Sequence, residues 1–247
     1  MRKIIGNFKM NKTPSETKQY ILQLMSKVEG NKNEIVLCVP STSLTSAKFL
    51  LTGSNIKLGG QNICDEELGK NTGEVSGQMI KDAGAEYVII GHSERRVKYK
   101  ENCRTNNKKI KIALKNRLKV VLCVGENLAE RNTLKMLESL KIQIEESLKG
   151  IYENELEHII IAYEPIWAIG SGKLPSNKEL EKAVKAIRKV ITDDFSEKAG
   201  KSIEIVYGGS LDAKNINQYL KIGTINGFLV GGSCLDANHF AQIIKEV

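Results

Sequence analysis

Short apolar runs alternate with segments of helical period along the whole chain, and this alternation leaves few architectures open. Eight runs of four to six residues, rich in β-branched and other apolar types, predict strands. They are Lys3–Phe8, Glu34–Val39, Ile56–Gly60, Glu86–Ile90, Lys119–Val124, His158–Tyr163, Ile203–Tyr207 and Gly227–Val230. The runs are continuous rather than alternating, as a parallel sheet covered by helices requires.

Segments between the runs carry apolar residues at helical spacing, as in Pro14–Val28 and Lys178–Ile191. The 247 residues supply eight strand–helix units, and at about 30 residues per unit this is the size of a closed barrel. Since no Gly/Ser/Pro linker or break in composition divides the chain, we expect residues 1–247 to form one α/β domain. Its predicted fold is a single closed (β/α)8 barrel with eight parallel strands.

The competing architecture is a doubly wound open sheet. Its dinucleotide-binding form needs Gly-x-Gly-x-x-Gly after the first strand, where this chain has Asn7-Phe8-Lys9-Met10. The segment Gly170–Lys173 resembles part of a nucleotide-binding phosphate loop, but Leu174 follows it and Trp167 occupies a position that needs glycine. Neither dinucleotide binding nor triphosphate hydrolysis is favoured.

Charge and cysteine content limit the possible binding partners and the cellular compartment of the protein. Lys and Arg exceed Asp and Glu by 8, which suits either nucleic acid or an anionic metabolite. Aromatic residues are only 5% of the chain, too few for good stacking platforms on single strands. The 5 cysteines are widely spaced without Cys-x-x-Cys, so neither disulfides nor a metal site is expected. No run is long enough to span a membrane, and we expect a cytoplasmic protein.

Residues that follow the strands are the candidates for chemistry, because barrel enzymes build their sites there. Lys9 follows the first run, His92 the fourth and Glu164 the sixth. They offer a cation, an imidazole that can act as acid or electrophile, and a carboxylate base. Each also has a structural interpretation: a solvated lysine, a histidine supporting the fold, a Glu-Pro pair that ends a strand. His92 favours chemistry, because Gly91 leaves open space and the next helix begins with a dipole that disfavours imidazolium.

Near-identical turns, Gly208-Gly209-Ser210 and Gly231-Gly232-Ser233, follow the last two runs. Alone, each would be a turn or a helix cap. As a pair on adjacent strands they predict backbone N–H groups around a phosphate. The segment Pro165–Lys173 begins apolar and ends glycine-rich directly after Glu164. It suits either a lid that excludes water or a buried connector.

Longer motifs at these positions, spread over nearly the whole chain, resemble the triosephosphate isomerase family. The matching stretches are Gly6-Asn7-Phe8-Lys9-Met10-Asn11, Tyr87-Val88-Ile89-Ile90-Gly91-His92-Ser93-Glu94-Arg95-Arg96, Cys123-Val124-Gly125-Glu126, the residues 162–173, Tyr207-Gly208-Gly209-Ser210 and Leu229-Val230-Gly231-Gly232. The departures are mild. Phe8 stands where tryptophan is common and Ser171 where threonine is usual, and Ser233-Cys234 replaces an alanine-serine pair.

The resemblance implies interconversion of dihydroxyacetone phosphate and glyceraldehyde 3-phosphate through an enediolate, a step of glycolysis and gluconeogenesis. Glu164 would move the proton and neutral His92 would polarise the carbonyl oxygens. Lys9 would stabilise the enediolate and phosphate charge, and Asn7 would hydrogen-bond the substrate oxygens. The residues implied around the phosphate are Gly170, Ser171, Ser210, Gly231 and Gly232, with Glu94 supporting the catalytic groups. No metal or organic cofactor is implied.

An irregular segment, Gln61–Glu74, follows the third run, and in the family this loop inserts into the neighbouring subunit. The resemblance therefore implies a homodimer through Gln61–Glu74, with a triose phosphate as the small-molecule partner and no nucleic acid or membrane partner. Thr72-Gly73-Glu74 match the family, whereas Lys70-Asn71 replace a small and an aromatic residue.

Other functions remain open at this point. A different barrel enzyme, such as an aldolase that forms a Schiff base on Lys9, would use the same architecture. The excess of 8 positive charges also fits a basic RNA-binding protein without catalysis, which would bind RNA tightly and with strong salt sensitivity.

Overall fold

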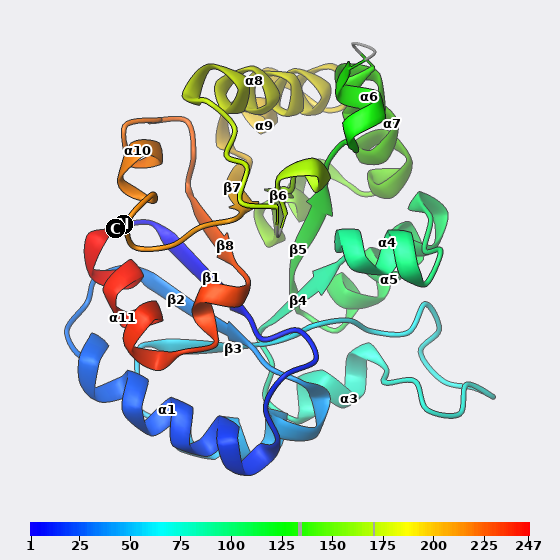
Figure 1. Cartoon of the computed structure of the whole chain (residues 1–247). Coiled ribbons are helices and arrows are strands. Elements are labelled where there is room, and N and C mark those ends of the chain that lie inside the picture. Colours follow the sequence, from blue (N-terminus) through cyan, green and yellow to red (C-terminus); the bar gives the residue numbers. More distant parts are fainter. Residues whose placement is uncertain (133–134, 170) are drawn as a thin grey trace.

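The computed structural model of the chain describes residues 1–132, 135–169 and 171–247. Within these ranges, β1 to β8 are all parallel and pair in chain order, and β8 pairs with β1 to close the sheet (Figure 1). The strands are β1 Lys3–Asn7, β2 Glu34–Cys38, β3 Ile56–Gly60, β4 Tyr87–Ile90, β5 Lys119–Val124, β6 Ile159–Tyr163, β7 Glu204–Gly209 and β8 Gly227–Val230. The prediction of a closed (β/α)8 barrel is confirmed.

Helices surround this barrel on its outer side (Figure 1). The α-helices are α1 Pro14–Val28, α2 Leu44–Leu51, α3 Gly77–Asp82, α4 Ser93–Lys98, α5 Cys103–Lys115, α6 Leu128–Asn132, α7 Met136–Leu148, α8 Asn177–Asp194, α9 Glu197–Ser202, α10 Asn217–Leu220 and α11 Ala237–Glu246. The 3-10 turns are η1 Ser41–Ser43, η2 Glu153–His158, η3 Ile166–Ala168 and η4 Gly232–Cys234. None of the described helices is both long and apolar enough to span a bilayer.

Sequence patterns set the limits of the two longest helices. Thr13 caps α1 and Ser176 caps α8, and in each a glutamate three residues later bonds back to the cap's own N–H. This reciprocal capping satisfies N–H groups that have no partner within the helix. α1 begins and ends where the periodicity predicts, and α8 runs slightly beyond the predicted Lys178–Ile191.

Strand residues divide between two apolar clusters, because successive side chains of a strand point to opposite faces. In β1, Ile5 packs inside the barrel, whereas Ile4 packs between the strands and the outer helices. The inner cluster comprises Ile5, Val36, Cys38, Tyr87, Ile89, Val121, Cys123, Ile160, Ala162, Val206 and Leu229. Burial on both faces explains why the strands read as continuous apolar runs.

One predicted turn is wrong. Gly208 and Gly209 belong to β7 and pair with Leu229 and Val230 of β8, rather than forming part of the turn after the strand. The backbone ladder to β8 continues through both glycines, so the chain leaves the sheet only at Ser210. At Gly208 a Cβ would lie 3.1 Å from Cγ of Glu164, so a larger residue in this part of the strand would crowd that side chain.

The segment from Gln61 to Glu74 has no regular secondary structure and projects beyond the ring of helices (Figure 1). Its first half is fastened to α5 of the same chain. Lys108 pairs with Asp65 at 3.1 Å and Lys115 with Glu67 at 2.8 Å. In the middle of the segment, Leu68 is 77% exposed.

Candidate active site

The loop after β1 carries a cation in a constrained backbone. Lys9 has φ +52°, a left-handed conformation that is unfavourable for a side chain with a Cβ. The N–H of Lys9 donates to Oδ1 of buried Asn7 at 2.9 Å, which holds this turn. Its ammonium pairs with Oε1 of Glu94 on α4 at 2.6 Å. Strained backbone that the surroundings hold in place is frequent at functional sites.

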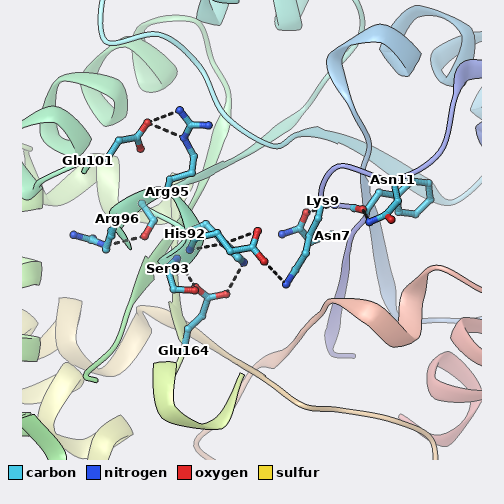
Figure 2. Close-up of polar contacts among 12 residues, drawn as sticks. Asn7, Lys9, Asn11, His92, Ser93, Arg95, Arg96, Glu101 and Glu164 are labelled. Atoms are coloured by element: carbon cyan, nitrogen blue, oxygen red, sulfur yellow. Dashed lines mark hydrogen bonds and ion pairs between the residues drawn. The ribbon is translucent and has the colours of Figure 1, made fainter. Parts of the chain in front are cut away.

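His92 and Glu164 face each other across the carboxyl ends of β4 and β6 (Figure 2). The imidazole Nε2 lies 3.2 Å from Oε1 of Glu164, and the N–H of Ser93 donates to the other carboxylate oxygen at 3.2 Å. Both side chains are buried, although each is ionisable. His92 is also the N-cap of α4, because its Nδ1 accepts the N–H of Glu94 at 3.2 Å.

This geometry assigns the histidine proton. An Nδ1 that accepts a hydrogen bond carries a lone pair, so the imidazole is neutral with its proton on Nε2, directed at Glu164. Burial lowers the pKa of His92, but the carboxylates of Glu164 and Glu94 outweigh it and leave the pKa raised. The hydrogen bond to Nδ1 still requires the neutral ring, because an imidazolium has no lone pair to accept the N–H of Glu94. Burial raises the pKa of Glu164, but contact with His92 and the Ser93 N–H outweighs it and leaves the pKa lowered. The lowered pKa keeps the Glu164 carboxyl ionised.

A small cavity of about 30 Å³ lies between these groups. It is lined by Asn7, Lys9, His92, Glu164, Ile169, Gly208, Gly209, Leu229 and Gly231. A neighbouring cavity of about 310 Å³ shares Asn7, Lys9 and His92 with it and extends toward Glu94 and Tyr99. The structure thus brings together the base, the imidazole, the ammonium and the amide that the sequence nominates.

The groups nominated for phosphate are arranged differently. The hydroxyl of Ser210 donates to the carbonyl of Ala168 at 2.7 Å, and the hydroxyl of exposed Ser171 donates to the carbonyl of Trp167 at 2.9 Å. Both serines thus hold backbone of the segment after β6. Gly231 lines the small cavity, whereas Gly232 is exposed at the start of η4. Gly170 lies outside the described residues.

The interpretation of Gly91 as open space beside His92 is wrong. Gly91 has φ +71°, and a Cβ there would lie 2.8 Å from Nδ2 of Asn106 and 2.9 Å from Nη2 of Arg96. Glycine is required because other side chains approach this backbone closely, not because the space is free.

Glu126, after β5, is a residue to which the sequence assigned no role. Its buried carboxylate accepts the indole N–H of Trp167 at 2.8 Å and the hydroxyl of Tyr163 at 3.1 Å. Burial raises the pKa of this carboxyl despite those hydrogen bonds. The guanidinium of Arg131 lies 3.5 Å from the centroid of the Trp167 ring. Glu126 follows β5 at the same rim as Glu164, and this position after a strand is the sequence signal that could have identified it as a residue of the site.

The barrel and its rim define a class of protein: a (β/α)8-barrel enzyme equipped to move protons on a small anionic substrate. A buried carboxylate base, an imidazole N–H and an ammonium group meet around one cavity. Within the described ranges, no group of three or more His, Cys, Asp or Glu side chains is arranged to hold a metal ion.

Comparison with known proteins gives the family. The sequence model of the family "Triosephosphate isomerase" matches residues 2–247. A triosephosphate isomerase of Alkaliphilus metalliredigens is 44% identical over 99% of this chain and 100% of its own length, and one of Finegoldia magna is 45% identical over 99% of each. The crystal structure of triosephosphate isomerase from Bartonella henselae superposes with a TM-score of 0.89 at 36% identity, covering 99% of this chain and 98% of that one. The chain belongs to the triosephosphate isomerase family, and its activity is the interconversion of triose phosphates.

Proposed function

We propose that Glu164 is the base that carries the proton between C1 and C2 of the triose phosphate. One carboxylate oxygen takes the proton from the carbon next to the carbonyl, which leaves an enediolate. The hydroxyl proton of the enediolate passes from the oxygen of the first carbon to that of the second, and the same carboxylate oxygen returns its proton to the neighbouring carbon. The observation that carries this role is the position of the ionised, buried carboxylate, 3.2 Å from His92 Nε2 and beside the small cavity.

His92 and Lys9 act on the oxygens. With its proton on Nε2, His92 donates to the carbonyl oxygen that becomes negative, and substrate replaces Glu164 as the partner of that N–H. The Lys9 ammonium and the Asn7 amide stabilise the enediolate, and Glu94 holds the ammonium in place at 2.6 Å. Donors fixed before the reaction stabilise developing charge without reorganisation.

The phosphate is held by N–H groups of Gly231 and Gly232 and by the segment containing Gly170 and Ser171. Ser210 contributes by holding that segment through its bond to the Ala168 carbonyl, at 2.7 Å. Gly231 supports this role because it lies at the cavity on the side of Lys9. Titration with inorganic phosphate should give competitive inhibition, and Gly232→Asp should weaken it by placing a carboxylate there.

A coupled assay of glyceraldehyde 3-phosphate isomerisation with Glu164→Gln tests the base. The amide preserves shape but cannot take a proton, so kcat should fall about 10³-fold, within the range for removal of a general base. Full activity would overturn the assignment. Borohydride with substrate should trap no adduct on Lys9, since a trapped imine would indicate the aldolase alternative.

A homodimer through Gln61–Glu74 is the assembly we propose. Leu68 in the middle of this segment is 77% exposed, and Met10 after β1 is 93% exposed. Such apolar side chains on a projecting segment suit a second copy of the chain. Sedimentation at micromolar concentration should show a dimer, whereas a fully active monomer would contradict it.

We also propose that the chain acts as one domain in the cytoplasm, where its substrates are found.

A further inference from the structure

Arg96 of α4 directs its guanidinium at main-chain carbonyls of the barrel rather than at a carboxylate or the substrate cavity. Its Nε donates to the carbonyl of Gly91 at 2.7 Å, and its Nη2 donates to the carbonyl of Cys123 at 3.0 Å. Its Nη1 contacts Sγ of Cys103 at 3.4 Å. The neighbouring Arg95 behaves in the ordinary way and pairs with Glu101 at 2.7 Å. Figure 2 shows Arg96 on the opposite side of His92 from Lys9.

The two carbonyls lie where the β4–β5 ladder ends. The last paired residues are Ile90 and Leu122, so Gly91 and Cys123 come one residue later on each strand. Arg96 joins the strand ends at this point, where the guanidinium bridges one carbonyl of each strand. A planar guanidinium with several fixed donors suits this task, whereas an ammonium acts as a single point charge.

Each joined residue leads directly to a reacting group. Gly91 immediately precedes His92, and the close approach of Arg96 and Asn106 leaves no room for a Cβ there. The residue after Cys123 on the same strand, Val124, accepts the N–H of Glu164 at 2.8 Å, so this strand also holds the backbone of the proposed base. One guanidinium therefore links the backbone that carries the imidazole to the strand that supports the carboxylate.

We propose that Arg96 is a positioning residue for the isomerisation, which sets the separation of His92 and Glu164 by joining the carboxyl ends of β4 and β5. The inference rests on the roles proposed above for those two residues. Arg96 lines neither the small cavity nor its larger neighbour, but it lines a separate tight crevice with Cys123 and Glu164, and so acts through its two neighbours. A displacement of about 1 Å between reacting groups can cost on the order of 10² in rate.

Arg96→Lys tests the geometry because it keeps the charge and removes the fork of donors. We expect kcat per folded protein to fall about 10-fold or more, with KM changed less than about 3-fold, since the phosphate contacts are untouched. Arg104→Lys on the exposed face of α5 is the matched control and should keep both constants. Circular dichroism and thermal unfolding give the folded fraction of each variant.

Arg96→Ala with added guanidinium chloride supplies the second measurement. Guanidinium at concentrations far below those that denature should restore kcat about 5-fold or more, and sodium chloride at equal ionic strength should not. A merely structural role would lower the folded fraction without this rescue. If Arg96→Ala does not fold, the lysine variant alone decides.

Two outcomes would overturn the proposal: kcat of Arg96→Lys within about 2-fold of the parent, or loss of kcat only in proportion to loss of folded protein. Glu164→Gln measured alongside separates this from the proposed function. Full activity of Glu164→Gln would overturn the base, and with it the separation that Arg96 is proposed to set. Full activity of Arg96→Lys beside an inactive Glu164→Gln would overturn the role of Arg96 alone.

Discussion

The two ends of the barrel use charge in opposite ways. At the amino end, Lys3 lies between Glu34 at 2.7 Å and Glu204 at 2.8 Å, and the Tyr87 hydroxyl also donates to Glu34. At the carboxyl end, the buried carboxylate of Glu164 contacts the imidazole Nε2 of His92 and the N–H of Ser93, and no lysine or arginine among the described residues pairs with it. The charges at the amino end satisfy one another, whereas the roles proposed for His92 and Glu164 at the carboxyl end need each of them to exchange the other for substrate.

Cavity size does not distinguish the two ends. The amino end has a cavity of about 770 Å³ beside Lys3 and Glu204, far larger than the 30 Å³ between His92 and Glu164. The amino-end lysine makes two ion pairs. At the other end the imidazole N–H and the carboxylate contact each other, and in the proposed mechanism they exchange that contact for substrate. Convergent groups that can exchange partners mark the site better than volume does.

The same substitution at the two ends should therefore have different consequences. Glu164→Asp withdraws the base by about 1 Å and should lower kcat on the order of 10²-fold, with thermal unfolding unchanged. Glu204→Asp, at the amino end of β7, is the matched control and should leave kcat as it is. Steady-state kinetics of both variants check this. Unchanged kcat in Glu164→Asp would remove Glu164 from the role of base.

The converse experiment removes the amino-end cation. Lys3→Met keeps the length of the side chain but leaves two carboxylates without their shared partner, which should destabilise the fold by about 2–3 kcal/mol. For a chain of this size, Tm should fall by about 5–10 °C. Calorimetry at one fixed protein concentration measures this, because assembly also shifts Tm. kcat should stay within about 2-fold, and a large loss would mean that the two ends are coupled.

The sequence predicted the two ends unequally well, for physical reasons. β-branched runs and loop motifs report backbone preference and local spacing, so the strands, α1 and the set His92, Glu164 and Lys9 could be predicted. The ion-pair network of Lys3, Glu34 and Glu204 at the amino end could not be predicted. These residues meet only after the barrel closes, when β1 pairs with β2 and β7 with β8. Glu126 and Arg96 were missed for the same reason, since their partners are distant in sequence.

The pH dependence of stability should isolate the amino end. Burial raises the pKa of Glu34, but bonds from Lys3 and Tyr87 outweigh it and leave the pKa lowered. Burial lowers the pKa of Lys3, but both glutamates outweigh it and leave the pKa raised. The Glu34 contribution is thus full above its ordinary pKa of 4.5 and is lost as pH falls through the lower folded value. The Lys3 contribution is full below 10.5 and is lost as pH rises through the higher folded value.

The measurement is the difference in Tm between the parent chain and Lys3→Met across pH. It should stay constant between about pH 5 and 9 and shrink as pH falls below 4.5, because protonated Glu34 no longer needs the ammonium. A difference that persists at pH 3 would show that Lys3 stabilises through packing of its aliphatic chain.

The smallest effect concerns steering of the substrate by the excess of 8 positive charges. A field that collects a dianion is screened over a Debye length of about 10 Å at 0.1 M salt, so kcat/KM should fall a few-fold from low to moderate salt. Charges near the carboxyl end should account for more of this slope than charges near the other. Lys214, exposed after β7, and Lys198, exposed beside the amino-end cavity, give a matched pair. Lys214→Gln should reduce the salt dependence of kcat/KM and Lys198→Gln should not.

Competition by chloride at the phosphate site lowers kcat/KM equally in both variants and cancels in the comparison. Equal slopes would mean that substrate capture depends on total charge and not on the end of the barrel that carries it.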